Sequence, residues 1–396
     1  MVKNNFLCYI DAMRKLYDTW EKPKKAFLVS ILNGNSSDEP RAAELRGLAE
    51  TLGLDVVSHE KIRVREKTPR YGMGNGKAEE LSKKAIELEA DLIVFDFNPN
   101  PAQQRNWEEL SGVPVLDRQE LIIRIFADRA ITREADLQVK LAELTYFLPR
   151  LTHKYIDLSR QRGGRYGTKG AGETKLETDR RKIEKRINLL EKEIEKVRKQ
   201  RQTQRRQRAR SDIPVCAIVG YTNAGKSSLL NAMTGAGVEA QDKLFVTLDA
   251  VTRRFEFAPG RYLLLTDTVG FIRDLPHSLI KAFRSTLEEA ALADILIIIL
   301  DASEPDIDSN YETTLSVLRG LGAGNIPKIV LLNKIDKIKL TKNNEELSEL
   351  EIIMNRFPDS IPVSVRNKTG FDAFKERITA SVDEIKNIQC NKDEPS

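Results

Sequence analysis

Gly220-Tyr221-Thr222-Asn223-Ala224-Gly225-Lys226-Ser227 is the stretch that decides the fold. It follows an apolar run of strand length, residues 214–219, and precedes a helical pattern that begins at Ser227. In that setting the G-x-x-x-x-G-K-S spacing is typical of a phosphate-binding loop. Its glycines let backbone N–H groups curve around phosphate oxygens, Lys226 adds positive charge, and the Ser227 hydroxyl can ligate Mg²⁺. A plain glycine turn explains neither the full spacing nor both flanks.

Two downstream segments complete the phosphate and metal side of such a site. Asp267-Thr268-Val269-Gly270 follows an apolar strand at residues 262–266, which places the Asp267 carboxylate at a strand end facing the metal position. The Gly270 N–H can then sense a γ-phosphate. Phe245-Val246-Thr247-Leu248-Asp249 lies before a strand at residues 251–257, and Thr247 is the candidate for a second hydroxyl on Mg²⁺.

Two further segments predict which base the site accepts. Asn333-Lys334-Ile335-Asp336 follows a strand at residues 328–332. The Asp336 carboxylate only accepts hydrogen bonds, so it suits the two N–H donors on one edge of guanine, a pair that adenine lacks. An unpaired buried carboxylate costs binding energy, which favours GTP over ATP. Ser364-Val365-Arg366, after a strand at residues 361–363, is expected to close over the base through a backbone N–H.

Four such motifs in this order at strand ends predict a P-loop GTPase domain with a doubly wound, mostly parallel sheet. We place this domain at residues 213–388 and a short tail at residues 389–396. The predicted GTP-binding residues are those of the five segments together with Ser228: Gly220, Tyr221, Thr222, Asn223, Ala224, Gly225, Lys226, Ser227, Ser228, Phe245, Val246, Thr247, Leu248, Asp249, Asp267, Thr268, Val269, Gly270, Asn333, Lys334, Ile335, Asp336, Ser364, Val365 and Arg366.

The chain before the phosphate loop begins with an extension, residues 1–25, and a small α/β domain, residues 26–118. Strand and helix patterns alternate there, which favours a parallel sheet. Within this domain Tyr71-Gly72-Met73-Gly74-Asn75-Gly76-Lys77 has glycines and a lysine before a helix, without the spacing of a phosphate loop. A turn with a helix cap is the favoured interpretation, and a second nucleotide site is the alternative.

Residues 119–212 predict an antiparallel helical hairpin. One long helix over residues 121–151 would pair with a helix whose Ile183, Ile187, Leu190, Ile194 and Val197 recur at spacings of four and three. A glycine-rich basic loop at residues 162–172 would form the tip. Residues 196–210 contain eight Lys or Arg and no Asp or Glu, which favours contact with a polyanion such as RNA over a solvated linker.

Composition argues against several other classes of protein. The 396 residues are 40% apolar, enough for two or three domains, and the net charge is only +5. The three cysteines and three histidines are scattered, without a zinc or disulfide pattern. No apolar run approaches the ~20 residues of a membrane span, and the N-terminus lacks a secretory pattern. We therefore expect a cytoplasmic monomer without a membrane span.

From about residue 26 onward the chain resembles the HflX-type ribosome-associated GTPases. The resemblance is carried by five stretches: residues 71–81, 115–118, 125–130, 170–181 and 270–277. It implies a factor that contacts the large ribosomal subunit and its RNA through the N-terminal domain and the hairpin. It also implies that this factor splits or rescues stalled and stressed ribosomes. A tRNA-modification GTPase, or another RNA-binding GTPase that uses GTP as a conformational latch, is the alternative.

By position, the resemblance implies Ser227 and Thr247 as Mg²⁺ ligands, with Asp267 beyond the direct ligands, and a K⁺ ion held by Asn223. The candidate catalytic residues are accordingly Lys226, Asn223 and Gly270. Val365 and Arg366 depart from the family pattern, which has Ala and Lys at these positions.

Phe271 follows Gly270 at the position where many GTPases have a glutamine that orients the attacking water. An apolar ring cannot hydrogen-bond to water, so we expect slow intrinsic hydrolysis that the ribosome accelerates. In the alternative interpretation, Phe271 packs the switch and Arg273 positions the water within the same chain.

Overall fold

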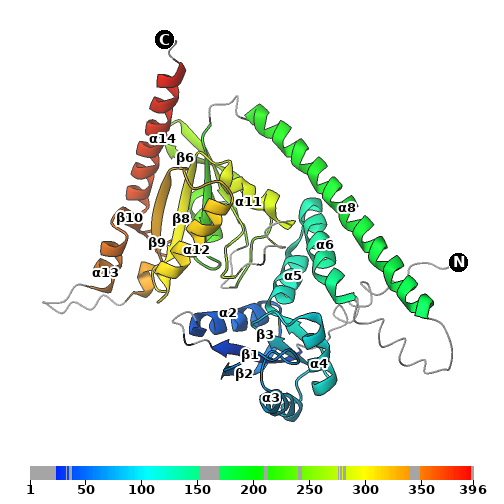
Figure 1. Ribbon diagram of the computed structural model, residues 1–396. Coiled ribbons are helices and arrows are strands. Elements are labelled where there is room, and N and C mark those ends of the chain that lie inside the picture. The colour runs from blue at the N-terminus through cyan, green and yellow to red at the C-terminus, as the bar shows by residue number, and fades with distance from the viewer. Residues whose placement is uncertain are drawn as a thin grey trace. The chain divides into compact units, whose positions relative to one another are not determined.

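The computed structural model describes residues 24–393 except 33, 35–37, 152–168, 209–212, 240–242, 275, 277–278, 280–281 and 339–347. The chain forms two compact units (Figure 1). The first comprises Met1–Asp128 and Leu137–Ile194, and the second comprises Arg129–Asp136 and Glu195–Ser396. The predicted extension lies outside the described residues up to position 23. Among the described helices, none combines the length and apolar character that crossing a bilayer requires.

The first unit contains a four-stranded parallel sheet in the order β2-β1-β3-β4, as the alternating pattern predicted. The central strand β1 reads KAFLVSIL and is buried along most of its length, as a strand with both faces covered must be. The strands are β1 (Lys25–Leu32), β2 (Asp55–Arg63), β3 (Leu92–Phe95) and β4 (Val115–Asp117), and the helices between them are α2 (Asp38–Thr51), α3 (Asn75–Glu87) and α4 (Pro101–Ser111).

The glycine-rich loop before α3 is a packed turn. Tyr71 and Met73 are buried in the core of the unit, and the Trp107 ring N–H donates to the Tyr71 carbonyl over 2.9 Å. Gly72 has a positive φ of 75° and lies against a Phe97 ring carbon that a Cβ would approach to 3.3 Å. Lys77 bonds to Glu80 over 2.7 Å. These contacts favour the turn interpretation over a second nucleotide site.

The predicted single helix over residues 121–151 is wrong. The chain forms α5 (Arg118–Arg129), α6 (Arg133–Phe147) and a 3-10 turn, η1 (Leu148–Arg150). Thr132 starts the second helix because its hydroxyl accepts the Ala135 N–H over 3.2 Å, which satisfies a donor that the helix itself leaves unpaired. The apolar pattern runs through this break without a Gly or Pro, so periodicity did not reveal it.

The helix α8 (Lys169–Arg208) is longer than predicted. Residues 169–172, expected in the glycine-rich loop, form its first turn, where N–H groups need no intrahelical partner and glycine is tolerated. The rest of that loop, residues 162–168, lies outside the described residues. Ile183 and Leu190 are buried while the residues around them are largely exposed, which confirms an apolar face on α8.

The second unit contains a six-stranded sheet in the order β10-β9-β8-β5-β7-β6, parallel except for the edge strand β6. This confirms the predicted doubly wound class. β5 lies between β7 and β8. After β5 the chain first builds β6 and β7 on one side and then crosses to β8 on the other side. Sheets of this class bind ligands at the ends of the strands where the direction of winding reverses. The strands are β5 (Val215–Gly220), β6 (Val251–Ala258), β7 (Arg261–Asp267), β8 (Ile295–Asp301), β9 (Lys328–Asn333) and β10 (Ser360–Pro362).

Helices cover both faces of this sheet. Leu229 and Leu230 of α9 (Lys226–Thr234) share one core with Phe374 and Ile378 of α14 (Phe371–Asp393). The helices α11 (Arg284–Ala291) and α12 (Ile307–Gly320) contact β5, and α12 crosses in front of the sheet in Figure 1. A short helix, α13 (Glu349–Arg356), precedes β10, and a 3-10 turn, η3 (Ile335–Lys337), follows β9.

The last helix also differs from the prediction. The boundary between the GTPase domain and a tail was expected after residue 388, but α14 continues through it to Asp393. Residues 389–393 contain neither glycine nor proline, so nothing in their backbone interrupts the helix.

Candidate nucleotide site

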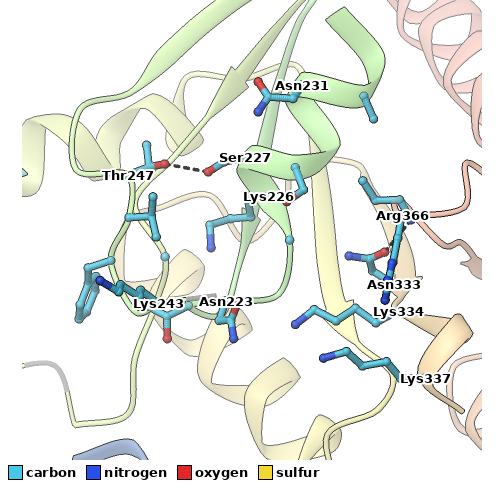
Figure 2. A pocket seen from close by; sticks show the side chains of 18 of the residues that line it. Asn223, Lys226, Ser227, Asn231, Lys243, Thr247, Asn333, Lys334, Lys337 and Arg366 are labelled. Atoms are coloured by element: carbon cyan, nitrogen blue, oxygen red, sulfur yellow. Dashed lines mark hydrogen bonds between the residues drawn. The ribbon is translucent and has the colours of Figure 1, made fainter. Parts of the chain in front are cut away.

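A cavity of about 530 Å³ lies in the second unit and brings four of the predicted segments to the phosphate loop. Figure 2 shows Lys226 at its centre, Ser227 and Thr247 at one side, and Asn333, Lys334 and Arg366 at another. The lining residues are Thr222, Asn223, Gly225, Lys226, Ser227, Ser228, Asn231, Ala232, Lys243, Phe245, Val246, Thr247, Gly270, Asn333, Lys334, Asp336, Lys337, Val365 and Arg366.

The phosphate loop requires its two glycines for different reasons. Gly220 has φ 149°, and a Cβ there would collide with the Ile299 carbonyl oxygen of β8. Gly225 has φ 103° and ends the loop at the start of α9, where a Cβ would collide with the Asn333 carboxamide. A side chain at position 220 would displace the backbone of β8, and one at position 225 would displace the Asn333 carboxamide. The unpaired N–H groups at the start of α9 consequently face the cavity, which suits an anion.

Lys226 is buried at the floor of this loop. Its Nζ donates to the Tyr221 carbonyl over 2.7 Å, and the side chain is 6% exposed. Burial lowers the pKa of Lys226 to about 8, while the charge of Asp267 acts in the opposite direction. A Cβ on Gly270 would lie 2.8 Å from Lys226 Nζ and 2.9 Å from Thr222 Cα. The lysine, the loop and the predicted γ-phosphate sensor therefore meet at one point.

Three oxygen-bearing side chains meet beside Lys226. Ser227 Oγ lies 2.7 Å from Thr247 Oγ1 and donates to Asp267 Oδ2 over 2.6 Å (Figure 2 shows the serine and the threonine). Burial raises the pKa of Asp267, and the charge of Lys226 opposes this rise. Asp267 Oδ1 is buried without a hydrogen-bond partner in the described part of the chain. Hydroxyl and carboxylate oxygens are the donors that Mg²⁺ prefers, so this set fits the ion.

The base side of the cavity is held together by Asn333. Its side-chain amide donates to the Ala224 carbonyl over 2.9 Å, and its oxygen accepts the Val365 N–H over 3.2 Å. The Ser364 hydroxyl donates to Asp336 Oδ1, which orients that carboxylate. Lys334 has a positive φ of 62° and its Nζ pairs with Asp301 over 2.7 Å. The phosphate loop, β9 and the residues after β10 thus form one hydrogen-bonded frame.

Comparison of the sequence with known proteins shows the family to which the chain belongs. Three family models match consecutive parts of the chain: "GTP-binding GTPase N-terminal" at residues 39–127, "GTP-binding GTPase Middle Region" at 129–208 and "50S ribosome-binding GTPase" at 215–334. "GTPase HflX" of Akkermansia muciniphila is 45% identical over 370 residues, covering 90% of this chain and 84% of the relative. The chain belongs to the HflX family of GTPases. It is therefore an enzyme that hydrolyses GTP.

Other members and one solved structure agree with this assignment. "GTPase HflX" of Escherichia coli is 37% identical to this HflX-family chain over 371 residues, covering 93% of the chain and 86% of the relative. A crystal structure of SsGBP with GDP aligns over 91% of the chain and 99% of its own length, at 25% identity and a TM-score of 0.50. The expected family and enzyme class are thus confirmed.

Not every predicted residue of this HflX-family GTPase lines the cavity. Gly220, Tyr221, Ala224, Leu248, Asp249, Asp267, Thr268, Val269, Ile335 and Ser364 are absent from the lining set. Some of them bind residues that do line it: Ser364 donates to the Asp336 carboxylate, and Asp267 accepts a hydrogen bond from Ser227. Asp249 is different, because its carboxylate accepts hydrogen bonds from residues 131 and 132 and is turned away from the nucleotide cavity.

Four lining residues were not predicted: Asn231, Ala232, Lys243 and Lys337. Each follows or precedes a recognised motif by a few positions, so extending the motifs along their elements would have found them. Asn231 Nδ2 donates to the Val238 carbonyl over 2.6 Å, and Asn231 Oδ1 accepts the Val238 N–H over 2.7 Å. It therefore anchors the chain after α9.

The contacts of Phe271 and Arg273 bear on which group orients the attacking water, an external activator or Arg273 of the same chain. Phe271 is 1% exposed, so its ring is packed in the protein interior. Arg273 does not line the cavity, and its guanidinium bonds to Asn310 over 2.9 Å and to Asp306 over 3.3 Å at the start of α12. These contacts hold the Arg273 side chain against α12 and count against the alternative in which Arg273 orients the water.

Proposed function

We propose that this GTPase binds the large ribosomal subunit in its GTP state and splits stalled or stressed ribosomes. The observation that supports this most is the single sign of charge on the last part of α8. Residues 196–208 of this helix carry seven Lys or Arg and no acidic residue. This segment belongs to the same compact unit as the nucleotide site. A helical segment of this composition favours contact with phosphate backbones, in which the ribosome is rich.

The upstream part of α8 shows what a solvated helix face looks like in this chain. Arg180 pairs with Glu184 over 2.9 Å and Arg181 with Glu177 over 3.1 Å, one helical turn away in each case. Downstream, Lys196 and Lys199 are exposed, and Arg198 pairs with Glu288 of α11 over 2.9 Å. The basic segment is thus joined to the GTPase domain through Arg198 and presents lysines to the solvent.

We predict that replacing the basic residues of this segment with glutamine weakens ribosome binding. The variant changes Lys196, Lys199, Arg201, Arg205, Arg206 and Arg208 and keeps Arg198. Each lost phosphate contact should reduce the slope of log K against log salt by about 0.7–0.9. Cosedimentation with large subunits across a salt series measures that slope. The control replaces three exposed basic residues outside the hairpin, Arg253, Arg377 and Lys386, with glutamine. Equal slopes for wild type and the downstream variant would contradict the proposal.

Metal ions complete the proposed chemistry. Ser227 and Thr247 would hold Mg²⁺, with Asp267 acting through Ser227, and the ion would neutralise charge on the β- and γ-phosphates. Asn223 lines the cavity beside the loop with a positive φ of 62°, and we assign it to a K⁺ ion that would assist hydrolysis. Lys226 holds the phosphates, and Gly270 donates its N–H to the γ-phosphate.

We expect large ribosomal subunits to accelerate single-turnover GTP hydrolysis by about 10²-fold or more, which is the usual contribution of a positioned catalytic group. The reason is that Phe271 is buried and Arg273 is bound to α12, so neither orients the attacking water. Hydrolysis is measured with the full chain alone, with large subunits and with small subunits as the control. Equal rates in all three mixtures would show that the catalytic site is complete without the ribosome.

Splitting itself is tested with intact ribosomes. Sucrose-gradient profiles are recorded with the protein in GTP, in a non-hydrolysable GTP analogue and in GDP. We expect free subunits to accumulate with GTP and the analogue and not with GDP. Binding without any change in the profile would favour the alternative, an RNA-binding GTPase that acts as a conformational latch.

A further inference from the structure

The segment after Gly270 is joined to the phosphate loop by a short strip of backbone pairing. The Phe271 N–H donates to the Gly220 carbonyl over 3.0 Å, and the Thr222 N–H donates to the Phe271 carbonyl over 2.8 Å. Tyr221 and Phe271 thus form an isolated parallel bridge. Gly270 lies directly before this bridge, so its position depends on how firmly the segment is held.

A side chain extends this strip by one more bond. The Arg273 N–H donates to Tyr221 Oη over 2.8 Å, and the Arg273 guanidinium lies 5.8 Å from the centre of the Tyr221 ring. The same guanidinium is held by Asn310 and Asp306. Residue 273 is therefore fixed through its backbone by the phosphate loop and through its side chain by α12.

We propose that Tyr221 is a positioning residue for GTP hydrolysis. Tyr221 is not among the residues that line the cavity. Its hydroxyl fixes the Arg273 N–H, and the backbone on either side of Tyr221 holds Phe271 through the bridge. Together these contacts restrain the segment that begins at Gly270, whose N–H would meet the γ-phosphate. A donor held in place before the reaction stabilises the transition state without a reorganisation cost.

Tyr221→Phe tests this role because it removes only the hydroxyl. Single-turnover hydrolysis by the full chain should slow about tenfold, as expected for the loss of one positioning hydrogen bond, while GDP affinity stays within twofold because GDP lacks the γ-phosphate. Tyr311→Phe is the matched control, since the Tyr311 ring packs on Phe357 and lies outside the cavity lining. Unchanged hydrolysis in Tyr221→Phe, or an equal loss of GDP affinity that marks a merely structural role, would overturn the proposal.

Arg273 and Asn310 provide a second, independent test. If Arg273 acts by bracing the segment against α12, then Arg273→Ala and Asn310→Ala both slow hydrolysis, and the double variant is no slower than Arg273→Ala alone. If Arg273 instead acted on the water itself, Asn310→Ala would leave the rate unchanged, and the brace would be refuted.

A separate observation concerns Asp249, two residues after Thr247. Its carboxylate accepts the Thr132 hydroxyl, the Thr132 N–H over 3.2 Å and the Ile131 N–H over 3.3 Å. Arg129 pairs with Glu239, upstream of the same segment, over 3.3 Å. Residues 129–132 belong to the second unit, and α6, which begins next, leads the chain into the first unit.

We infer that Asp249 transmits the nucleotide state to the start of α6. This inference rests on the proposed role of Thr247 as a metal ligand. Thr247 would be held by the metal only while the γ-phosphate is present, and only two peptide units separate it from Asp249. Release of Thr247 after hydrolysis would free the carboxylate from Ile131 and Thr132 and leave the first turn of α6 without its anchor.

Hydrogen–deuterium exchange of residues 130–136 tests this coupling in the full chain. We expect slower exchange with a non-hydrolysable GTP analogue than with GDP, and loss of that difference in Asp249→Ala. Thr132→Ser, which keeps the hydroxyl, should retain the difference. Equal exchange in both nucleotide states of the wild type, or a difference that persists in Asp249→Ala, would refute the coupling. Magnesium-dependent binding of the analogue to Thr247→Ala checks the role of Thr247 separately.

Discussion

Asp336→Asn is expected to change the preferred nucleotide from GTP to XTP. The carboxylate of Asp336 accepts two N–H donors of guanine, whereas a carboxamide offers one acceptor and one donor and therefore suits xanthine, whose edge carries a carbonyl oxygen. Loss of a charge-assisted pair in a closed site corresponds to about 10²-fold weaker GTP binding. The carboxamide oxygen of this variant can still accept the Ser364 hydroxyl, so the frame around the base should stay intact.

Affinities of wild type and Asp336→Asn for GTP, XTP and ATP measure this switch. Asp359→Asn serves as the control because Asp359 is exposed and does not line the cavity. XTP affinity should rise while GTP affinity falls, and ATP should stay weak in both proteins. An unaltered preference for GTP would mean that another group reads the guanine edge.

Lys226→Ala has the second large expected effect. Lys226 is the buried cation at the floor of the phosphate loop, and its ammonium now bonds to the Tyr221 carbonyl. Removing it deletes a charge-assisted hydrogen bond to phosphate and leaves that carbonyl without its donor. We expect GTP affinity to fall about 10²-fold and hydrolysis to become undetectable on the time scale of the wild type.

The measurement is equilibrium binding of fluorescent GTP and GDP analogues, followed by single-turnover hydrolysis. Lys386→Ala, an exposed lysine on α14, is the matched control. The thermal midpoint separates loss of binding from loss of folding, and it should stay close to that of the wild type. Wild-type affinity in Lys226→Ala would remove the lysine from the phosphate site.

Much of the nucleotide site could be predicted because its determinants are local in sequence. Gly220, Gly225 and Lys226 occur within one loop. The motifs that begin at Asp267, Asn333 and Ser364 each lie at or just after the end of a strand that its apolar residues identify. Parallel strands end at the same edge of a sheet, so motifs at strand ends must converge. The meeting of Ser227 and Asp267 within hydrogen-bond distance follows from this rule, whereas Thr247 reaches them from the loop before the antiparallel strand β6.

The features that the sequence did not predict are those in which a residue distant in sequence decides the local structure. The break before α6 depends on Thr132 and Asp249, which are 117 positions apart in sequence. The sequence offered Arg273 as a candidate to position the water, and it gave no sign that Asn310 of α12 binds the Arg273 side chain. Tyr221 occupies a variable position of the phosphate-loop motif, so the motif assigns it no role. The bond from the Arg273 N–H to the Tyr221 hydroxyl forms where the phosphate loop and the segment after Gly270 are paired at Phe271.

The sequence by itself determined that this protein is a GTPase, and it predicted which segment reads the base and which loop holds the phosphates, because spacing within a motif dictates backbone geometry directly. Only the tertiary structure decided where the long helix breaks, what Asp249 contacts and how Tyr221 and Arg273 hold the segment after Gly270. Those contacts join residues that are brought together only when helices cover the sheet. Pattern along a chain reports local geometry and burial, but it does not specify which polar groups will meet.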